Sequence, residues 1–569
     1  MEYKGKELGF IPSEYQKKVI DFVLHGQGNG IISATAGSGK TTTLVSLMKY
    51  ISPLQKCLFV AFNKSIVEKL STDLQMFDNV IVKTSHGLGF DMLTKNYGKD
   101  ITVNEFKYSK YLRENINNLT TNKSISDFYL HNIIQLIHLS RFYLAQSIKE
   151  IQKIADKYSI VLVQDECEVV QKCLKWGRQN MSVVDYTDLL WLPTENSLRP
   201  IKSQFDWIII DECQDLSLAS IKLIQKCIKR GTRIISCGDI NQQIYTFSGA
   251  SDDAFETLKN LPHTTEFSLP ISYRCAKSIV KLANVLVPDM QCSINAEEGN
   301  VTYNTDLSVI KKGDMVLARN KLPLLMLYKE LIKNNVNAYI KKSDSDTDFE
   351  YLLSNIDKNT PLSVYLDSDG VFPYLFRLLF DGVYKLMADF KMSKQEALIH
   401  KSIVELYDNI QCLATLSENC SDLNCLLSKI KELFTQTEDA VCLSTIHKAK
   451  GLECENVHII CHSAIPSILA KAEWELKQER NLLYVAYTRA KNNLTFISED
   501  IIPNIYTPNK QKEYIQYMGL IEKRLKQLNL NPIAEHIVKK RFHLNNSNVI
   551  TINNKQSNDN STILTDLLD

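Results

Sequence analysis

Near the N-terminus, a glycine-rich segment has the residue types that bind phosphate. It follows a short apolar run, opens a helical pattern and reads Ala34-Thr35-Ala36-Gly37-Ser38-Gly39-Lys40-Thr41. Glycines let successive backbone N–H groups face a phosphate at the positive end of the helix that follows. Lys40 would reach the β- and γ-phosphate oxygens, and the hydroxyl of Thr41 would bind Mg²⁺. We predict a nucleotide-binding loop over these residues and Thr42, although Ala34 stands where the general pattern has glycine.

A second segment supplies the acids that such a loop needs. The apolar run 207–210 ends in Asp211-Glu212, and a carboxylate at the carboxyl end of a buried strand lies beside the phosphate loop in doubly wound sheets. Asp211 would hold Mg²⁺ through water, and Glu212 would orient and deprotonate the attacking water. Alone, adjacent acids are a weak signal, and a glycine turn with a chance lysine is the alternative reading of the first segment. Together, the two segments indicate an ATPase.

The elements around both segments alternate between strands and helices. Residues 57–61 form a continuous apolar run, typical of a strand buried on both faces of a parallel sheet. Similar short strands are expected at 208–210, 234–237, 457–460 and 494–496. A helical stripe after the glycine-rich segment consists of Leu44, Leu47, Met48 and Ile51. This alternation predicts open, mostly parallel α/β sheets, interrupted at 92–180 and 346–436 by mainly helical insertions.

The composition is that of a globular chain without a global electric field. A length of 569 residues predicts about four domains or subdomains. The 44% hydrophobic and 23% charged content excludes a disordered or fibrous chain. A formal net charge of +1 leaves any nucleic-acid binding to local patches of the surface.

The cysteines and the chain start predict a soluble, intracellular protein of the cytoplasm or nucleus. None of the 14 cysteines is spaced Cys-x-x-Cys, so free buried thiols in a reduced compartment are expected. The start lacks the apolar run of a signal peptide, and no apolar stretch is long enough for a membrane span. The Asn-rich residues after about 543 predict disorder. Residues 539–541 are basic and read as a solvated helix face or a weak DNA or partner contact.

Further motifs resemble, in the expected order, those of the UvrD/Rep-like superfamily 1 DNA helicases over most of residues 10–497. The matching segments around and after the phosphate loop are Gln16, Ala61-Phe62-Asn63-Lys64, Thr84-Ser85-His86-Gly87, Asp185-Tyr186-Thr187-Asp188-Leu189-Leu190 and Asp211-Glu212-Cys213-Gln214-Asp215. Those further along are Leu269-Pro270-Ile271-Ser272-Tyr273-Arg274, Thr445-Ile446-His447-Lys448-Ala449-Lys450-Gly451-Leu452-Glu453 and Tyr484-Val485-Ala486-Tyr487-Thr488-Arg489-Ala490. The most discriminating motif spans 238–250, where Ser248 replaces the arginine common in the family, so the support of the stacked aromatic is expected to differ.

The resemblance implies a role for each nucleotide-site residue. Gln16 and Tyr273 would contact adenine, Gln242 would sense the γ-phosphate, and Gly451 and Glu453 would touch the nucleotide. The implied catalytic residues are Lys40, Glu212, Gln242, Arg274 and Arg489, the two arginines acting as fingers on the γ-phosphate. Guanidinium groups offset the charge that spreads over the phosphoryl oxygens in the transition state.

The resemblance also implies a set of DNA contacts, formed by Phe62, Asn63, His86, Tyr245, Phe247, Thr445 and His447. Aromatic rings stack on bases of any sequence, which suits a protein that moves along a strand. Structural alternatives remain open at this stage. Tyr245, Phe247 and Tyr273 could be core aromatics, and both histidines could be structural. Arg319, beside another family segment, could form a surface salt bridge.

The expected architecture is two RecA-like α/β cores with the ATP site between them. The first core comprises 1–91 and 181–270 and the second 271–345 and 437–506, with helical insertions at 92–180 and 346–436, the latter reduced. Residues 507–569 would form a C-terminal extension. The resemblance implies an ATP- and Mg²⁺-dependent helicase that moves 3′→5′ on single-stranded DNA and acts at duplex junctions in repair, recombination or replication. The alternative is a DNA-stimulated ATPase switch that activates a partner such as a nuclease; an RNA helicase is disfavoured by the 238–250 motif.

Overall fold

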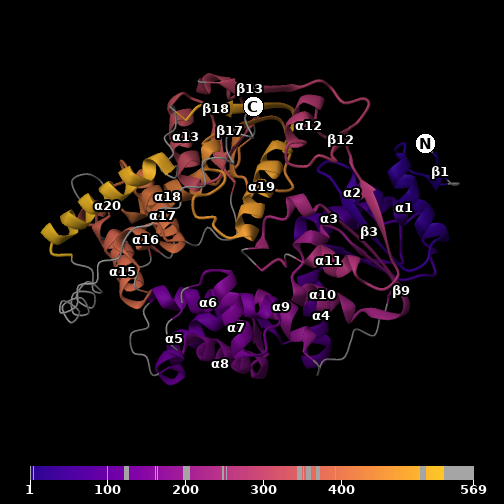
Figure 1. Cartoon of the computed structure of the whole chain (residues 1–569), viewed down its shortest axis with the longest axis horizontal. Coiled ribbons are helices and arrows are strands. Elements are labelled where there is room, and N and C mark those ends of the chain that lie inside the picture. The colour runs from indigo at the N-terminus through magenta and orange to yellow at the C-terminus, as the bar shows by residue number, and fades with distance from the viewer. Residues whose placement is uncertain are drawn as a thin grey trace, which may run out of the picture. The chain divides into compact units, whose positions relative to one another are not determined.

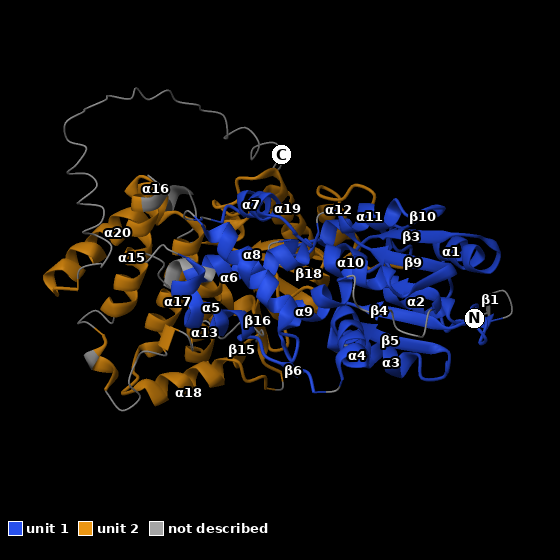
Figure 2. Ribbon diagram, turned by 90° about the horizontal axis from the view of Figure 1, so that it is seen from below, with its two compact units in different colours: residues 1–274, 290–294 blue, residues 275–289, 295–569 orange. Residues whose placement is uncertain are grey.

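In the computed structural model (Figure 1) the chain forms two compact units. One unit contains residues 1–274 and 290–294, and the other contains residues 275–289 and 295–569 (Figure 2). The structure describes residues 2–3, 6–98, 100–120, 127–160, 162, 165–195, 205–246, 249–251, 253–304, 306–341, 349, 352–353, 361–366, 372–390, 392–437, 439–499 and 508–530.

The first unit is built on a parallel six-stranded sheet with the order β10-β3-β9-β8-β4-β5. Every neighbouring pair in this sheet is parallel. Its strands are β3 (Asn29–Ala34), β4 (Cys57–Ala61), β5 (Val80–Thr84), β8 (Phe205–Ile210), β9 (Ile228–Gly238) and β10 (Thr264–Leu269). Because all strands run the same way, their carboxyl ends form one edge of the sheet.

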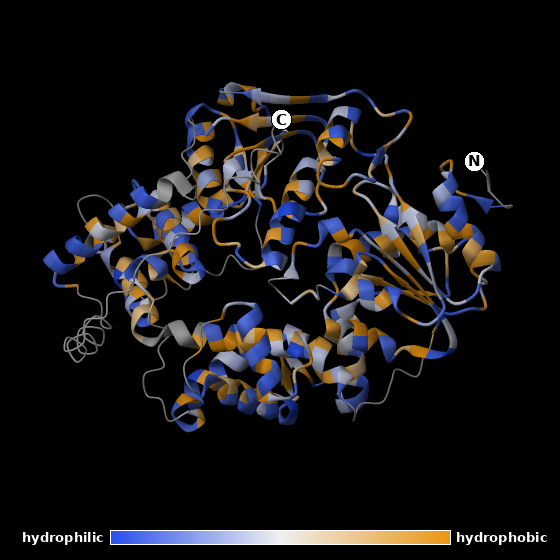
Figure 3. Ribbon diagram, in the orientation of Figure 1, coloured by the Kyte–Doolittle hydropathy of each residue, from blue (hydrophilic) through white to orange (hydrophobic). Residues whose placement is uncertain are grey.

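Helices cover both faces of this sheet, which explains the continuous apolar runs of its central strands. Leu58 and Val60 of β4 join a core with the helices α4 (Ser85–Tyr97), α10 (Leu218–Gln225) and α11 (Ala254–Lys259). The intervening Cys57 and Phe59 join a core on the other face, with α1 (Glu14–His25), α2 (Lys40–Leu47) and α3 (Lys64–Asp73). The hydrophobic strands of the sheet stand out in Figure 3.

Between β5 and β8 the first unit carries a mainly helical insertion, as the sequence predicts. Its helices after α4 are α5 (Lys107–Leu119), α6 (Asp127–Phe142), α7 (Ile148–Lys157), α8 (Glu166–Gln179) and α9 (Tyr186–Trp191). A short parallel pair of strands, β6 (Thr102–Val103) and β7 (Val183–Val184), joins its two ends. Two further short pairs in this unit are β1 (Glu2–Tyr3) with β2 (Lys6–Glu7), and β11 (Ile271–Ser272) with β12 (Gln291–Cys292).

The second unit repeats the architecture with a parallel sheet of order β13-β18-β17-β14-β16-β15. Its strands are β13 (Asn300–Asn304), β14 (Met315–Ala318), β15 (Ala338–Ile340), β16 (Val441–Thr445), β17 (Cys454–Ile459) and β18 (Ala490–Ile497). The helices α12 (Lys277–Ala283), α13 (Lys321–Lys333) and α19 (Glu473–Tyr487) accompany this sheet. The predicted fold class, two parallel α/β cores with helical insertions, is therefore confirmed.

The insertion of the second unit contains α15 (Pro373–Phe390), α16 (Lys394–Leu398), α17 (Lys401–Ser417) and α18 (Leu423–Leu433). A C-terminal helix, α20 (Pro508–Gln527), packs on this insertion. The ring of Tyr514 lies 4.9 Å from that of Tyr407, and its hydroxyl donates to the carbonyl of Leu398 over 3.1 Å. The Asn-rich tail and the basic residues 539–541 lie outside the described residues. Among the helices that the structure describes, none has the length and apolar character to cross a bilayer.

Candidate nucleotide and nucleic-acid site

The phosphate loop follows β3 and leads into α2, the arrangement that the sequence predicts. Gly39 caps α2 with a φ of 75°, and Gly37 has a φ of 71°. A Cβ atom at Gly37 would lie 2.5 Å from the Cβ of Arg274 and 2.8 Å from the hydroxyl of Ser272. The backbone N–H of Tyr273 donates to the carbonyl of Gly37 over 2.9 Å. The structure thus brings together the phosphate loop and the Tyr273-Arg274 segment, and only glycine fits at their contact.

Two pairs join the phosphate loop to the end of β8. The ammonium of Lys40 donates to Oε2 of Glu212 at 3.0 Å, and the hydroxyl of Thr41 donates to Oδ2 of Asp211 at 2.6 Å. Glu212 has a φ of 52°, which a residue with a side chain seldom adopts. Such strained backbone clusters at functional sites, where it aims a side chain that the regular strand would direct elsewhere.

Burial and mutual repulsion set the charge of this cluster. Burial, together with the neighbouring Glu212 carboxylate, raises the pKa of Asp211 to about 6, against the lowering effect of Lys40 and Thr41. Burial also raises the pKa of Asp239, again opposed by Lys40. For Lys40, burial lowers the pKa, but the carboxylates of Glu212, Asp239 and Asp211 outweigh it and the net shift is upward. Lys40 is therefore a permanent cation among acids.

The donor chemistry of the cluster fits a magnesium–triphosphate. Thr41 and Asp211 offer a hydroxyl and a carboxylate oxygen, the hard donors that Mg²⁺ prefers. No group of three or more His, Cys, Asp or Glu side chains suited to a metal occurs among the residues described. Two protein donors are enough for Mg²⁺, because it retains water and takes further oxygens from the phosphates.

Gln16 lies beside the phosphate loop, at the start of α1. Its side-chain carbonyl accepts from the backbone N–H of Ser13 over 2.9 Å, and its amide donates to the hydroxyl of Thr43 over 2.9 Å. That hydroxyl in turn donates to the carbonyl of Gly39. The residue is buried and completes the N-terminal cap of α1. Its position next to the loop suits the predicted contact with adenine, which stays a prediction.

A buried glutamine links the acids to the segment after β9, and sequence reasoning assigned it no role. Gln214 donates to Oε2 of Glu212 over 2.7 Å and accepts from the backbone N–H of Asp239 over 3.0 Å. Oδ2 of Asp239 accepts from the amide of Gln242 over 2.8 Å. Gln214 belongs to the acidic motif in the sequence, but its burial and its partner 25 residues away are visible only in three dimensions.

Aromatic side chains gather at the same edge of the sheet. The rings of Phe62, after β4, and Tyr245, after β9, stack with centroids 5.8 Å apart and planes 14° apart. Phe62 is 39% exposed and Tyr245 is half-buried, so neither belongs to the closed core. Asn63 caps α3 by accepting from the N–H of Ile66 over 2.9 Å. Phe247 lies outside the described residues.

A second aromatic pair lies at the start of α4 and includes a residue to which the sequence assigned no role. Tyr186 meets the ring of His86 edge-on, with centroids 6.3 Å apart, and is 53% exposed. Burial lowers the pKa of His86, and the charge of Asp185 partly offsets this effect. The signal for Tyr186 was its place in the 185–190 motif, where the family has phenylalanine.

Two models of protein families match this chain. The model for the UvrD/REP helicase N-terminal domain matches residues 15–263, and that for the UvrD-like helicase C-terminal domain matches residues 440–497. The chain belongs to the UvrD/Rep-like superfamily 1 helicases. The suspected family, and the enzyme class of ATP-dependent helicases that it implies, are thereby confirmed.

Curated relatives of this UvrD/Rep-like chain carry helicase names. The F-box DNA helicase protein 1 of Schizosaccharomyces pombe is 23% identical over 86% of this chain, which spans 58% of that protein. The probable DNA helicase II homolog of Mycoplasma genitalium is 21% identical, covering 85% of this chain and 84% of the relative. The ATP-dependent DNA helicase Rep of Buchnera aphidicola subsp. Acyrthosiphon pisum is 20% identical, covering 84% of this chain and 94% of the relative. Among solved structures, an arterivirus nonstructural protein 10 (helicase) covers 86% of this chain and 64% of its own at 9% identity and a TM-score of only 0.30.

The remaining UvrD/Rep motifs lie in the second unit. Arg489 is buried, and its guanidinium donates to the carbonyls of Val485 and Leu452 at 2.9 and 3.0 Å. Leu452 stands between Gly451 and Glu453, so the structure brings these three predicted nucleotide residues together within the unit.

Thr445 is the last residue of β16, and His447 follows this strand, in the second unit. Burial, reinforced by the positive charge of Arg319, holds the pKa of His447 well below its usual value. Arg319 donates from both Nε and Nη2 to the carboxylate of the mostly buried Glu479, at 2.7–3.2 Å. Arg319 therefore forms an ion pair within this unit, the structural alternative that the sequence left open.

Proposed function

We propose that this UvrD/Rep-like chain is an ATP-driven translocase that moves 3′→5′ along single-stranded DNA and separates strands at duplex junctions. One observation carries the proposal: the short segment after β9 holds both Gln242, linked through Asp239 and Gln214 to Glu212, and Tyr245, stacked on exposed Phe62. A movement of Gln242 at the phosphates can therefore reach the aromatic ring of Tyr245, which lies three residues further along the chain and offers a surface the size of a base. The UvrD/Rep family implies ATP as the fuel.

Each site residue of the first unit has its own role toward ATP. Lys40 would bind the β- and γ-phosphate oxygens, and Thr41 and Asp211 would hold Mg²⁺, which would neutralise the phosphate charge. Glu212 orients the attacking water and takes its proton. Its salt bridge with Lys40, at 3.0 Å, holds the carboxylate in place. Gln214 donates to the same carboxylate and fixes the rotamer that water would meet.

Two arginines complete the proposed chemistry. Arg274 lies against Gly37 in the phosphate loop, and Arg489 is held by backbone carbonyls next to Gly451 and Glu453 in the second unit. Arginines that meet the transferred phosphoryl group contribute about 10³–10⁵ to the rate of phosphoryl transfer. We propose that both act on the γ-phosphate and that Gln16 and Tyr273 flank the adenine.

DNA is the proposed track. Phe62 and Tyr245 form one stacking surface and His86 with Tyr186 another, each at the carboxyl edge of the first sheet. Stacking of a base on an aromatic ring contributes about 1–3 kcal/mol without sequence preference. In the second unit, Thr445 and His447 are the proposed backbone contacts. Roles in repair, recombination or replication, and a nuclease or replication factor as partner, are further proposals from the family.

A second candidate function is a DNA-stimulated ATPase that switches a partner without unwinding. The observation in its favour is the small second insertion, expected at 346–436, in which the structure describes the four helices α15 to α18. A small insertion offers less surface to hold the duplex ahead of the junction.

Strand displacement separates the two candidates. The full chain with ATP and Mg²⁺ is mixed with labelled duplexes that carry a 3′ or a 5′ single-stranded tail, and ATP hydrolysis is measured in parallel with single-stranded DNA or RNA. Displacement of the 3′-tailed duplex only supports the proposed function. Strong stimulation by DNA without displacement of either duplex supports the switch, and equal stimulation by RNA contradicts DNA as the track.

A further inference from the structure

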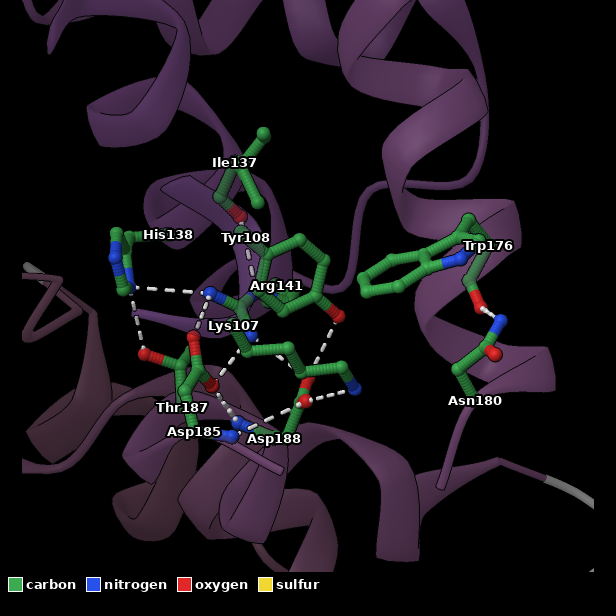
Figure 4. Close-up of polar contacts among 10 residues, drawn as sticks. All are labelled: Lys107, Tyr108, Ile137, His138, Arg141, Trp176, Asn180, Asp185, Thr187 and Asp188. Atoms are coloured by element: carbon green, nitrogen blue, oxygen red, sulfur yellow. Dashed lines mark hydrogen bonds and ion pairs between the residues drawn. The ribbon is translucent and has the colours of Figure 1, made fainter. Parts of the chain in front are cut away.

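The last turn of α6, in the helical insertion, is locked to one segment of the proposed DNA site. Arg141 is fully buried and donates from Nη1 to Oδ1 of Asp185 at 2.6 Å and from Nη2 to Oδ2 of the same carboxylate at 2.8 Å. Nη1 also reaches Oδ1 of Asp188 at 2.7 Å. Figure 4 shows this guanidinium facing the two acids. Because Asp185 and Asp188 form the capping box of α9, Arg141 fixes the helix that begins with Tyr186.

The positive and negative charges of this cluster are equal in number, which favours a single arrangement of its side chains. Lys107 donates to Asp188 at 2.6 Å, and the hydroxyl of Tyr108 donates to the same carboxylate at 2.8 Å (Figure 4). Two cations thus meet two carboxylates in an almost completely buried site. A buried charge left without its partner is costly, so such a group holds one arrangement.

Phe142, which follows Arg141, and Tyr158, after α7, contact a second segment of the proposed DNA site at Gly249 and Thr246. Gly249 has a φ of 98°, and a Cβ atom there would lie 2.2 Å from the ring of Phe142. The hydroxyl of Tyr158, after α7, donates to the carbonyl of Thr246 over 2.8 Å. Thr246 directly follows Tyr245, so the hydrogen bond holds the backbone next to the stacking ring.

The available donors and acceptors fix the direction of this hydrogen bond and identify the group that donates to Tyr158. Tyr158 has one hydroxyl hydrogen, and the carbonyl of Thr246 can only accept it. The hydroxyl of Tyr143, 2.8 Å from that of Tyr158, must therefore donate to it. Lys157, which has only donors, lies 3.1 Å from the Tyr143 oxygen. The result is a directed chain from the Lys157 ammonium through two phenols to the carbonyl of Thr246, and such chains polarise and strengthen each member.

We propose that Tyr158, supported by Tyr143 and Lys157, is a positioning residue of the DNA site: it holds the backbone at Thr246 so that the neighbouring Tyr245 meets the bases. This inference rests on the proposed function. The helical insertion would then contribute to DNA binding. It would support the segment that carries Tyr245 in a chain that has Ser248 where the family commonly has arginine.

Tyr158→Phe tests the proposal because it removes only the hydroxyl. ATP hydrolysis by the full chain is titrated with oligothymidylate, and binding of a labelled oligothymidylate is followed by fluorescence anisotropy. Loss of the hydrogen bond should raise both the DNA concentration for half-maximal stimulation and the dissociation constant about five- to tenfold. The KM for ATP and the DNA-free turnover should stay at the wild-type values, because the phosphate loop is untouched.

Two further variants test the chain itself. Tyr143→Phe should shift the DNA constants in the same direction but by less, and adding it to Tyr158→Phe should give no further loss, since both act through one carbonyl. Tyr328→Phe, which removes a partly buried phenol from α13 in the second unit, is the matched control and should change neither DNA constant. Additive effects of the first two variants would overturn the directed chain.

The variants Tyr245→Ala and Tyr158→Phe together distinguish a failure of the positioning role from a failure of the proposed function. If Tyr245→Ala leaves DNA stimulation unchanged, the proposed aromatic DNA site is wrong. If Tyr245→Ala weakens stimulation and Tyr158→Phe does not, only the positioning role fails. The positioning role also fails if Tyr158→Phe lowers the melting temperature and impairs ATP and DNA constants alike, since that is the behaviour of a purely structural residue.

Discussion

At the residue scale, the phosphate site places charged carboxylates in a buried position, at a cost in stability. Asp211 is almost completely inaccessible, and its neighbour Glu212 adds a second carboxylate to the same end of β8. These two causes raise the pKa of Asp211 to about 6. In the unfolded chain the same carboxyl titrates near its ordinary value of about 3.9. Between these values the folded state holds the proton more tightly, so stability falls as the pH rises through this window and the full cost is present above about pH 6.

Asp211→Asn should therefore stabilise the protein without Mg²⁺ at pH 8, by about 1–2 kcal/mol, while abolishing Mg²⁺-dependent turnover. The gain should shrink as the pH is lowered through 6 toward 4, where the wild-type carboxyl is protonated in the folded state and increasingly so in the unfolded chain. Thermal melting at pH 8 and pH 5, without Mg²⁺ or nucleotide, measures the effect. A variant that melts below the wild type at pH 8 would show that the carboxylate does not destabilise the fold.

Gly37 provides a second test at this scale. Gly37→Ala would combine a φ of 71° with a Cβ only 2.5 Å from that of Arg274. The strain should cost about 1–3 kcal/mol of stability and displace the phosphate loop. Nucleotide-induced thermal stabilisation should disappear.

Gly231→Ala is the matched control for Gly37→Ala. Gly231 has a φ of 87°, but a Cβ there would meet no atom within 4 Å. This variant carries the backbone strain alone and should keep the nucleotide response. Equal behaviour of both variants would contradict a steric role of the contact between the loop and Arg274.

At the scale of elements, the buried four-charge cluster of Lys107, Arg141, Asp185 and Asp188 ties α5 and α6 to α9. Breaking one partner of a buried pair costs about 3–5 kcal/mol because the other charge stays buried alone. Asp188→Asn should therefore strongly destabilise the first unit. The double variant Lys107→Met/Asp188→Asn leaves Arg141 with Asp185 and should recover much of the loss.

Urea unfolding followed by tryptophan fluorescence, to which Trp176 in α8 and Trp191 in α9 contribute, reports on this cluster. The predicted result is a double variant more stable than Asp188→Asn alone. If the two substitutions instead add, Lys107 and Asp188 are not an energetic pair.

The elements that carry local patterns were predictable from the sequence. The run 57–61 and the acids after Ile210 were predictable because burial on both faces and strand-end chemistry are written in adjacent residues. The fold class followed from the same alternation. The partners of Gln214 and Tyr158 were not predictable, since Tyr158 and Thr246 lie 88 residues apart and meet only through the packing of the insertion. No local pattern encodes such a contact.

At the scale of the whole molecule, two parallel sheets of the same size occur in two units, and the family motifs are shared between them. The first unit holds the phosphate loop, both acids and Arg274, while the second holds Arg489 and the predicted backbone contacts. The net charge of +1 provides no general attraction for DNA. Binding should therefore depend on the aromatic pairs and on local contacts.

Hydrolysis of ATP by Glu212 in response to DNA is the central claim for this molecule. The most direct measurement is steady-state ATP turnover of the wild type and Glu212→Gln, with and without saturating single-stranded DNA, alongside nucleotide and DNA binding. The variant should bind both ligands while its DNA-stimulated turnover falls about 10²–10⁴-fold, the contribution of a positioned general base. Turnover by Glu212→Gln at the wild-type rate would contradict the claim.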